Sequence, residues 1–214
     1  PLTGAKVASY YKPGETWTTV FGKLANPFEE CRAEAVSLYL ALEDDAMAIF
    51  GQTTQADRDA TLHIVWLNMV RAGVVGLEMY TPETKQWRQA HAQGRYCILQ
   101  VLARAPNSIV TLEHKPETND LTVSIDASRI RTDGKAAIAG LLRHLNINKA
   151  LADLDAGSKY FGDHTSVDEK FVGIRQTVMN VRKPRKQFVQ AHTSSGADDG
   201  AGEVEYADFE ASKE

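Results

Sequence analysis

Three glutamates near the start of a predicted helix have the clearest capacity for chemistry in this sequence. They are Glu29, Glu30 and Glu34. Because residues four apart share one side of a helix, the carboxylates of Glu30 and Glu34 can point the same way. One could then bind a hard or borderline cation while the other orients a neighbouring histidine. The spacing alone favours a simpler alternative, in which the acids stabilise the positive end of the helix dipole.

A histidine and an arginine share the same spacing on a later predicted helix. His91 and Arg95 are four residues apart, and Arg88 lies one turn earlier. An imidazole beside a guanidinium can bind a carboxylate or stabilise an oxyanion. His91 also falls on the apolar stripe of this helix, so a packing role is the favoured interpretation from the residues alone.

The motifs that define many other enzyme classes are missing. The sequence contains no His-Glu-x-x-His, no Cys-x-x-Cys, no phosphate-binding glycine-rich loop and no Gly-x-Ser-x-Gly. The two cysteines, Cys31 and Cys97, are too few for a disulfide framework or a four-thiolate zinc site. We expect them to be small buried side chains.

Helices are expected to position these residues in the first half of the chain. Asn26 and Pro27 are typical of a helix start, and this helix is predicted to continue to Gly51. A second helix is predicted over 57–80 from its apolar stripe. A third is predicted over 81–104, because Thr-Pro-Glu repeats the combination of a cap and a proline.

The second half of the chain is less regular. Alternating residues at 108–112 and 121–125 predict a β-hairpin, and helices are predicted over 133–145 and 167–180. Candidate strands follow at 186–191 and 203–206. The predicted fold class is therefore mainly α, of the α+β kind, with a small β-hairpin and an extended C-terminal tail.

Composition and charge narrow the possible partners. The 214 residues are 43% hydrophobic and 24% charged, which is ordinary for a soluble globular protein. The net charge of −4 comes from an acidic tail, because residues 193–214 carry roughly −6 and the rest roughly +2. The basic run at 182–186 is short and has few aromatic neighbours, so nucleic-acid binding is not expected.

A membrane location is not expected either. The most apolar stretch, 62–80, contains His63, Arg71 and Glu78, which are costly in lipid. No secretory signal precedes it, so we expect a cytoplasmic protein. The chain starts at Pro1 without a Met, which suggests a piece of something longer.

One stretch resembles a known motif. Residues 28–40 read Phe-Glu-Glu-Cys-Arg-Ala-Glu-Ala-Val-Ser-Leu-Tyr-Leu and resemble the second zinc-site motif of the dipeptidyl peptidase III family of zinc metallopeptidases. Residues 14–17 before it, and segments at 66–73, 80–83 and 87–91 after it, match the same family in the same order. The similarity is close from about Tyr11 to Leu102 and thinner afterwards.

The resemblance implies a role for each candidate residue. Glu30 corresponds to a zinc ligand, and Glu34 to the acid that orients a zinc-bound histidine. His91 corresponds to the histidine that stabilises the scissile carbonyl. Substrate binding is expected of residues near it and at the cleft between two lobes. These are Gln89, Arg95, Arg185 and Lys186.

The chain departs from the family pattern in one decisive way. It has no His-Glu-x-x-Gly-His, the helix that supplies two zinc-binding histidines and the general base in this family. We therefore expect a C-terminal-region fragment that is inactive alone and completed by the remainder of the parent enzyme. Thr18 also follows Trp17 where some relatives are expected to have an acid, so a substrate-amine contact is not expected there.

Two functional hypotheses follow. By resemblance, residues 1–184 form part of a helical zinc lobe, and residues 185–214 cross to a β-barrel lobe. The parent would be a zinc-dependent exopeptidase that releases dipeptides from the N-terminus of short peptides. The alternative is a non-catalytic helical module that binds peptide or protein partners.

Overall fold

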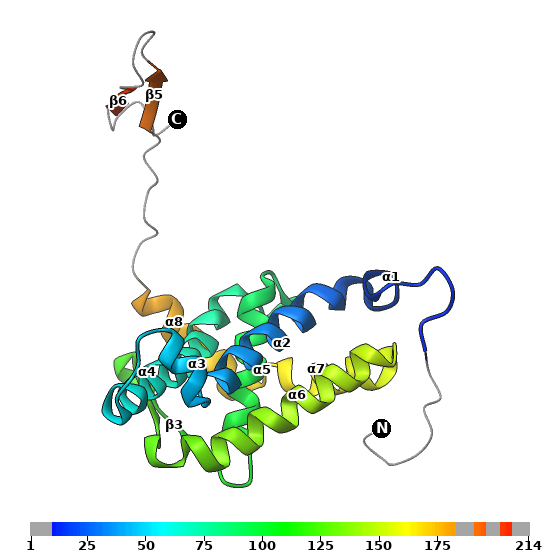
Figure 1. Ribbon diagram of the computed structural model, residues 1–214, viewed down its shortest axis with the longest axis horizontal. Coiled ribbons are helices and arrows are strands. Elements are labelled where there is room, and N and C mark those ends of the chain that lie inside the picture. Colours follow the sequence, from blue (N-terminus) through cyan, green and yellow to red (C-terminus); the bar gives the residue numbers. More distant parts are fainter. Residues whose placement is uncertain (1–9, 183–190, 196–201, 207–214) are drawn as a thin grey trace. The chain divides into compact units, whose positions relative to one another are not determined.

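The computed structural model describes residues 10–182, 191–195 and 202–206. The chain divides into two units, Pro1–Val181 and Arg182–Glu214. The helices belong to the first unit (Figure 1). They are α1 (Trp17–Phe21), α2 (Ala25–Leu40), α3 (Asp44–Ile49), α4 (Gln55–Val75), α5 (Ala90–Arg104), α6 (Lys135–Ala150), α7 (Leu154–Thr165) and α8 (Glu169–Val181). The prediction of a mainly helical fold is confirmed.

The described strands form three separate antiparallel pairs. They are β1 (Tyr80–Thr81) with β2 (Gln86–Trp87), β3 (Val110–Lys115) with β4 (Asp120–Ile125), and β5 (Ala191–Ser195) with β6 (Gly202–Tyr206). The predicted hairpin is thus confirmed as β3–β4, with Val110 opposite Ile125. The predicted strand at 203–206 is confirmed as β6. The one at 186–191 lies outside the described residues except for Ala191.

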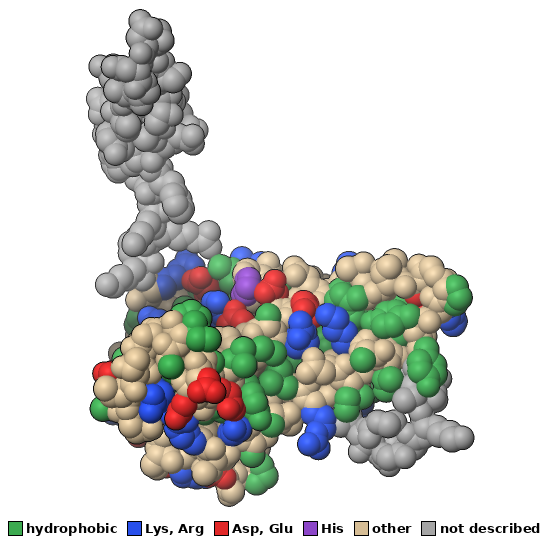
Figure 2. Space-filling model, viewed as in Figure 1, with side chains coloured by type: hydrophobic (Ala, Val, Ile, Leu, Met, Phe, Trp, Pro, Cys, Tyr) green, Lys and Arg blue, Asp and Glu red, His purple; other side chains and the backbone are tan. Residues whose placement is uncertain are grey.

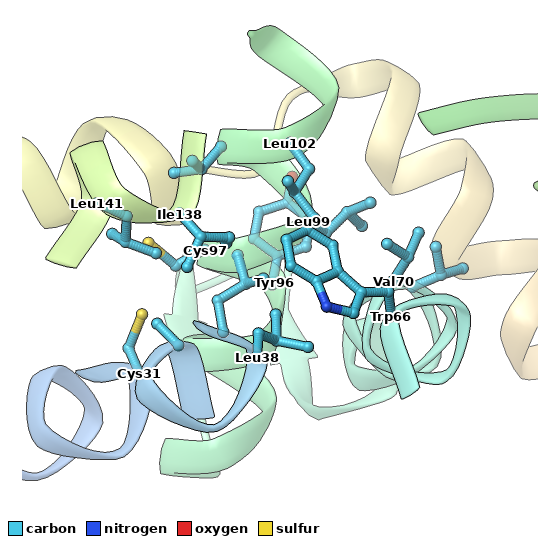
Figure 3. Close-up of a cluster of buried hydrophobic side chains, with 14 of the residues drawn as sticks. Cys31, Leu38, Trp66, Val70, Tyr96, Cys97, Leu99, Leu102, Ile138 and Leu141 are labelled. Carbon is cyan, nitrogen blue, oxygen red and sulfur yellow. The ribbon is translucent and has the colours of Figure 1, made fainter. Parts of the chain in front are cut away.

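Helix α5 is the central element of the first unit. It packs against α2, α4, α6 and α7, and an unbroken run from Tyr96 to Leu102 is buried. Figure 3 shows side chains from α2, α4 and α6 meeting around it, among them Leu38, Trp66 and Ile138, each with no exposed surface. Burial of such large apolar side chains is the main stabilising contribution to the fold.

The first predicted helix is wrong at both ends. The helix begins at Ala25, with Leu24 at the N-cap position. A 3₁₀ turn over Gly22–Leu24 leads directly into it, and the carbonyl of Gly22 accepts a hydrogen bond from the Ala25 amide. The helix ends at Leu40 rather than at Gly51. A turn there places Leu42 in the core, 6% exposed, and a separate helix, α3, follows. Gly51, with φ of 82°, lies just beyond α3.

The predicted start of the third helix at residues 81–83 is also wrong. Tyr80 and Thr81 pair with β2 instead, across a turn in which Lys85 adopts φ of 53°. The hairpin is favoured because it brings the rings of Tyr80 and Trp87 together, with centroids 5.2 Å apart. Helix α5 begins only at Ala90, and its predicted end at Arg104 is correct.

Two of the remaining helices follow the predicted pattern, since α6 and α8 match the predictions at 133–145 and 167–180, although α6 extends to Ala150. Two helices were not predicted. One is the five-residue α1. The other is α7, whose buried face consists of Gly157, Phe161 and Thr165, and two of these residues carry no apolar signal that a sequence pattern can detect.

Helix α4 corresponds to the predicted second helix. Together with the following turn it spans Gln55–Met79 and is the one helix among the described residues long and apolar enough to cross a membrane by length and composition. A core helix of a soluble protein passes the same test. In this structure Leu62, Trp66 and Val70 lie in the core.

Ion pairs connect α3, α4 and the turn that contains Arg131. Arg131 lies 3.3 Å from Asp59 and 3.7 Å from Asp44, which also approaches Arg58 at 3.5 Å. Figure 2 shows acidic and basic side chains gathered over this region. These contacts tie α3 and α4 to the turn that precedes α6.

Candidate functional site

The candidate site lies where α2 and α5 cross. A Cβ atom on Gly94 would come within 2.9 Å of the Cys31 backbone nitrogen, so only glycine allows this approach. Cys31 and Cys97 are fully buried at the same contact, as expected (Figure 3). Cys31 lies between Glu30 and Glu34 in the chain, and Gly94 lies between His91 and Arg95. The crossing therefore brings the two predicted pairs face to face.

Glu34 is the centre of the arrangement. Its Oε1 lies 3.0 Å from Nδ1 of His91, and the Nε of Arg95 donates to Oε1 and Oε2 at 2.8 and 2.9 Å. Nη2 of Arg95 lies 2.8 Å from Oε1. Glu30 approaches Nδ1 of His91 at 3.4 Å. The two predicted constellations thus form one cluster.

The protonation chemistry of this cluster follows from its donors and acceptors. An ionised carboxylate only accepts, so Nδ1 of His91 is the donor to Glu34. A singly protonated ring then has an accepting Nε2, whereas the doubly protonated ring also donates from Nε2. The hydrogen bond from Arg95 to Glu34 raises the pKa of the guanidinium above its ordinary value.

His91 is not a buried packing residue. Its side chain is 43% exposed, while that of Glu34 is 15% exposed and that of Glu30 31%. The partner of His91 is a carboxylate rather than the core, so the packing interpretation suggested by the apolar stripe does not describe this structure. The exposed imidazole and Glu30 are accessible to a ligand.

Glu29 points elsewhere. Its carboxylate accepts from Arg32 Nε at 3.0 Å and from Lys149 Nζ at 2.6 Å. Hydrogen bonding to Arg32 is the main cause that lowers the pKa of Glu29 to about 2. The sequence pattern gave Glu29 no partner of its own, because Lys149 lies 120 residues further along the chain.

Gln89 has a structural role that the sequence prediction missed. Its side-chain oxygen accepts from the backbone amide of Ala92 and caps α5. The sequence predicted the helix start at residues 81–83, so it gave no reason to expect Gln89 to be the N-cap residue of α5. Arg185 and Lys186 lie outside the described residues.

The metal-binding capacity of the described residues is limited. They contain no group of three or more His, Cys, Asp or Glu side chains placed to hold a metal ion. Glu30, a partly exposed carboxylate, has the chemistry of a single zinc ligand. A catalytic zinc needs three protein ligands, so the residues present fit part of such a site.

Comparisons with known proteins identify the family of this chain. The model of Peptidase family M49 matches residues 1–214. The chain belongs to this peptidase family. Among curated relatives it is similar to dipeptidyl peptidase 3 of Nematostella vectensis, with 43% identity over 98% of this chain and 28% of that protein. It is 42% identical to the Dictyostelium discoideum protein of that name and 39% identical to the human one. The chain covers 28% and 29% of these two proteins.

Proposed function

We propose that this chain is part of a zinc-dependent dipeptidyl peptidase that releases dipeptides from the N-terminus of short peptides. The observation that supports it most directly is the crossing of α2 and α5, which puts Glu30 and Glu34 against His91. Membership of Peptidase family M49 and the names of the relatives support the same activity.

Each residue of the cluster has a proposed role. Glu30 contributes one oxygen ligand, and the remaining ligands come from the rest of the parent enzyme. Zinc in such a site lowers the pKa of a bound water and polarises a carbonyl. Glu34 holds His91 through Nδ1 and, in the complete enzyme, also orients a zinc-bound histidine. His91, when doubly protonated, donates from Nε2 to the scissile carbonyl oxygen as negative charge develops there.

Substrate binding is proposed for residues at the edges of this cluster. The amide nitrogen of Gln89 remains available to a peptide because the cap uses only its oxygen. Arg185 and Lys186 would bind the C-terminal side of the peptide as cations. Arg95 was expected to join them, but its guanidinium is engaged by Glu34.

The proposed setting is the helical lobe of a two-lobed cytoplasmic enzyme. Residues 1–184 would belong to this lobe and residues 185–214 would reach the β-barrel lobe. Short peptides and the remainder of the enzyme are the proposed partners, with no role for nucleic acid or membrane.

The test separates metal binding from turnover in the complete peptidase. Glu30→Ala should abolish zinc retention, measured as metal content after dialysis, because it removes a ligand. His91→Ala should lower kcat and leave the metal content unchanged. Glu117→Ala, on an exposed turn, is the matched control and should change neither.

Two results would contradict the proposal. Full zinc content and turnover in Glu30→Ala would show that Glu30 is not a zinc ligand. A full coding sequence without a His-Glu-x-x-Gly-His helix would instead favour the non-catalytic interaction module.

A further inference from the structure

Arg95 holds Glu34 with two nitrogens rather than one. Nε donates to both carboxylate oxygens, at 2.8 and 2.9 Å, and Nη2 lies 2.8 Å from Oε1. Contact through a rigid guanidinium fork sets the orientation of a carboxylate as well as its position. A single donor would leave the carboxylate free to rotate about its last bond.

The orientation of Glu34 matters because His91 uses the same oxygen. Nδ1 of His91 lies 3.0 Å from Oε1, the atom that Arg95 also contacts. His91 and Arg95 stand one turn apart on α5, while Glu34 belongs to α2. The side chain of Glu34 is also 85% shielded from solvent, which leaves water little opportunity to replace either donor.

We propose that Arg95 is a positioning residue, which acts through Glu34 to hold Nδ1 of His91 and thereby turns Nε2 toward the substrate. The effect of Arg95 on turnover rests on the proposed function. The contacts among Arg95, Glu34 and His91 do not depend on it. The competing role is a direct contact between Arg95 and the peptide. The two roles predict different outcomes for the same substitution.

The first experiment needs no catalysis. Nitrogen-15 NMR of the metal-free 214-residue chain reports which ring nitrogen of neutral His91 carries the proton, with His91→Gln used for assignment. The Nδ1–H form should predominate in the wild-type chain, because a carboxylate accepts from that atom. Arg95→Met should reduce the share of this form, and Arg95→Lys should restore part of it.

The matched control is Arg104→Met, on the same helix. Arg104 donates to the backbone oxygen of Asp163 and lies about two and a half turns beyond Arg95, so the His91 spectrum should not change. A wild-type ring that carries its proton on Nε2, or an Arg95→Met spectrum identical to the wild type, would overturn the proposal.

The second experiment uses the complete peptidase. Arg95→Met should lower kcat by about 10- to 100-fold, which is typical when an outer partner of a site residue is lost. KM should change by less than about twofold, because no substrate contact is removed. A raised KM with unchanged kcat would show that Arg95 contacts the substrate and would overturn the proposal. If even the wild-type enzyme released no dipeptides, the proposed function would fail, while the NMR result would still decide the role of Arg95.

Discussion

At the scale of single residues, neighbours in the motif serve different purposes. Glu29 and Glu30 are adjacent, so their side chains leave α2 about 100° apart. Glu29 meets Lys149, whereas Glu30 and Glu34 meet His91. Membership of one motif therefore does not imply one role, and only the packing of α2 separates a structural acid from a candidate ligand.

Gln89 allows a prediction at this scale, because a cap and a substrate contact have different requirements. Gln89→Ala leaves the Ala92 amide without its partner and should lower the free energy of unfolding by about 1 kcal/mol, measured by urea denaturation. Gln89→Asn should preserve the stability, since Asn is a favoured cap. Loss of peptide affinity in Gln89→Asn at unchanged stability would identify a second, substrate-binding role. Full stability in Gln89→Ala would contradict the capping role.

At the scale of elements, the site depends on how closely α2 and α5 approach. Both helices carry small residues at the contact, Cys31 and Gly94, and the larger polar residues extend on either side of it. The close packing of the two backbones determines whether a carboxylate on one helix reaches an imidazole on the other.

We therefore predict that Gly94→Ala damages both the fold and the site. The added Cβ would meet backbone atoms of Cys31 that cannot rotate away, and the cost should be roughly 1–3 kcal/mol of unfolding free energy. Gly140→Ala on α6 is the matched control, because nothing lies within 4 Å of its Cβ. It should raise stability by up to about 1 kcal/mol. Equal changes in unfolding free energy for the two substitutions would show that the backbone of Cys31 does not exclude a Cβ atom at position 94.

A second prediction concerns the contact between α2 and α6. Lys149 pairs with Glu29 at 2.6 Å and lies 5.0 Å from the centre of the Trp17 ring. A double-mutant cycle of Lys149→Met and Glu29→Gln should give a coupling of about 0.5–1 kcal/mol that weakens in high salt. The exposed pair Lys159–Asp163 is the control, and its coupling should be smaller. A coupling for Lys149 no larger than for this control would show that the pair does not stabilise the helix contact.

At the scale of the whole molecule, the proposed site is only partly contained in this chain. Its helical unit has a core built around α5, and Glu30 is the one zinc ligand that we propose among the described residues. The chain covers less than a third of the length of its relatives.

The isolated chain should accordingly bind zinc weakly and release no dipeptides. One carboxylate cannot define a site that requires three protein ligands. Isothermal titration of the 214-residue chain with zinc, together with a peptidase assay, tests this prediction. Stoichiometric zinc binding accompanied by turnover would contradict it.

Much of the fold was predictable because its signals are local. The apolar stripe of α4 and the alternation in β3 and β4 each lie within one segment, and the structure confirms both. The errors have non-local causes. The helix expected at residue 81 is replaced by a hairpin because Tyr80 packs on Trp87, and the break after Leu40 occurs because the core accommodates Leu42.

The sequence by itself determined the identity of the candidate residues and their spacing, since four-residue intervals on helices follow from local geometry. The resemblance of residues 28–40 to a zinc-site motif also requires no coordinates. Only the tertiary structure decided which groups meet. Glu34 and His91 are 57 residues apart in the chain, and their contact depends on a backbone approach that Gly94 permits. Such an approach is a property of two packed helices, and neither helix encodes it alone.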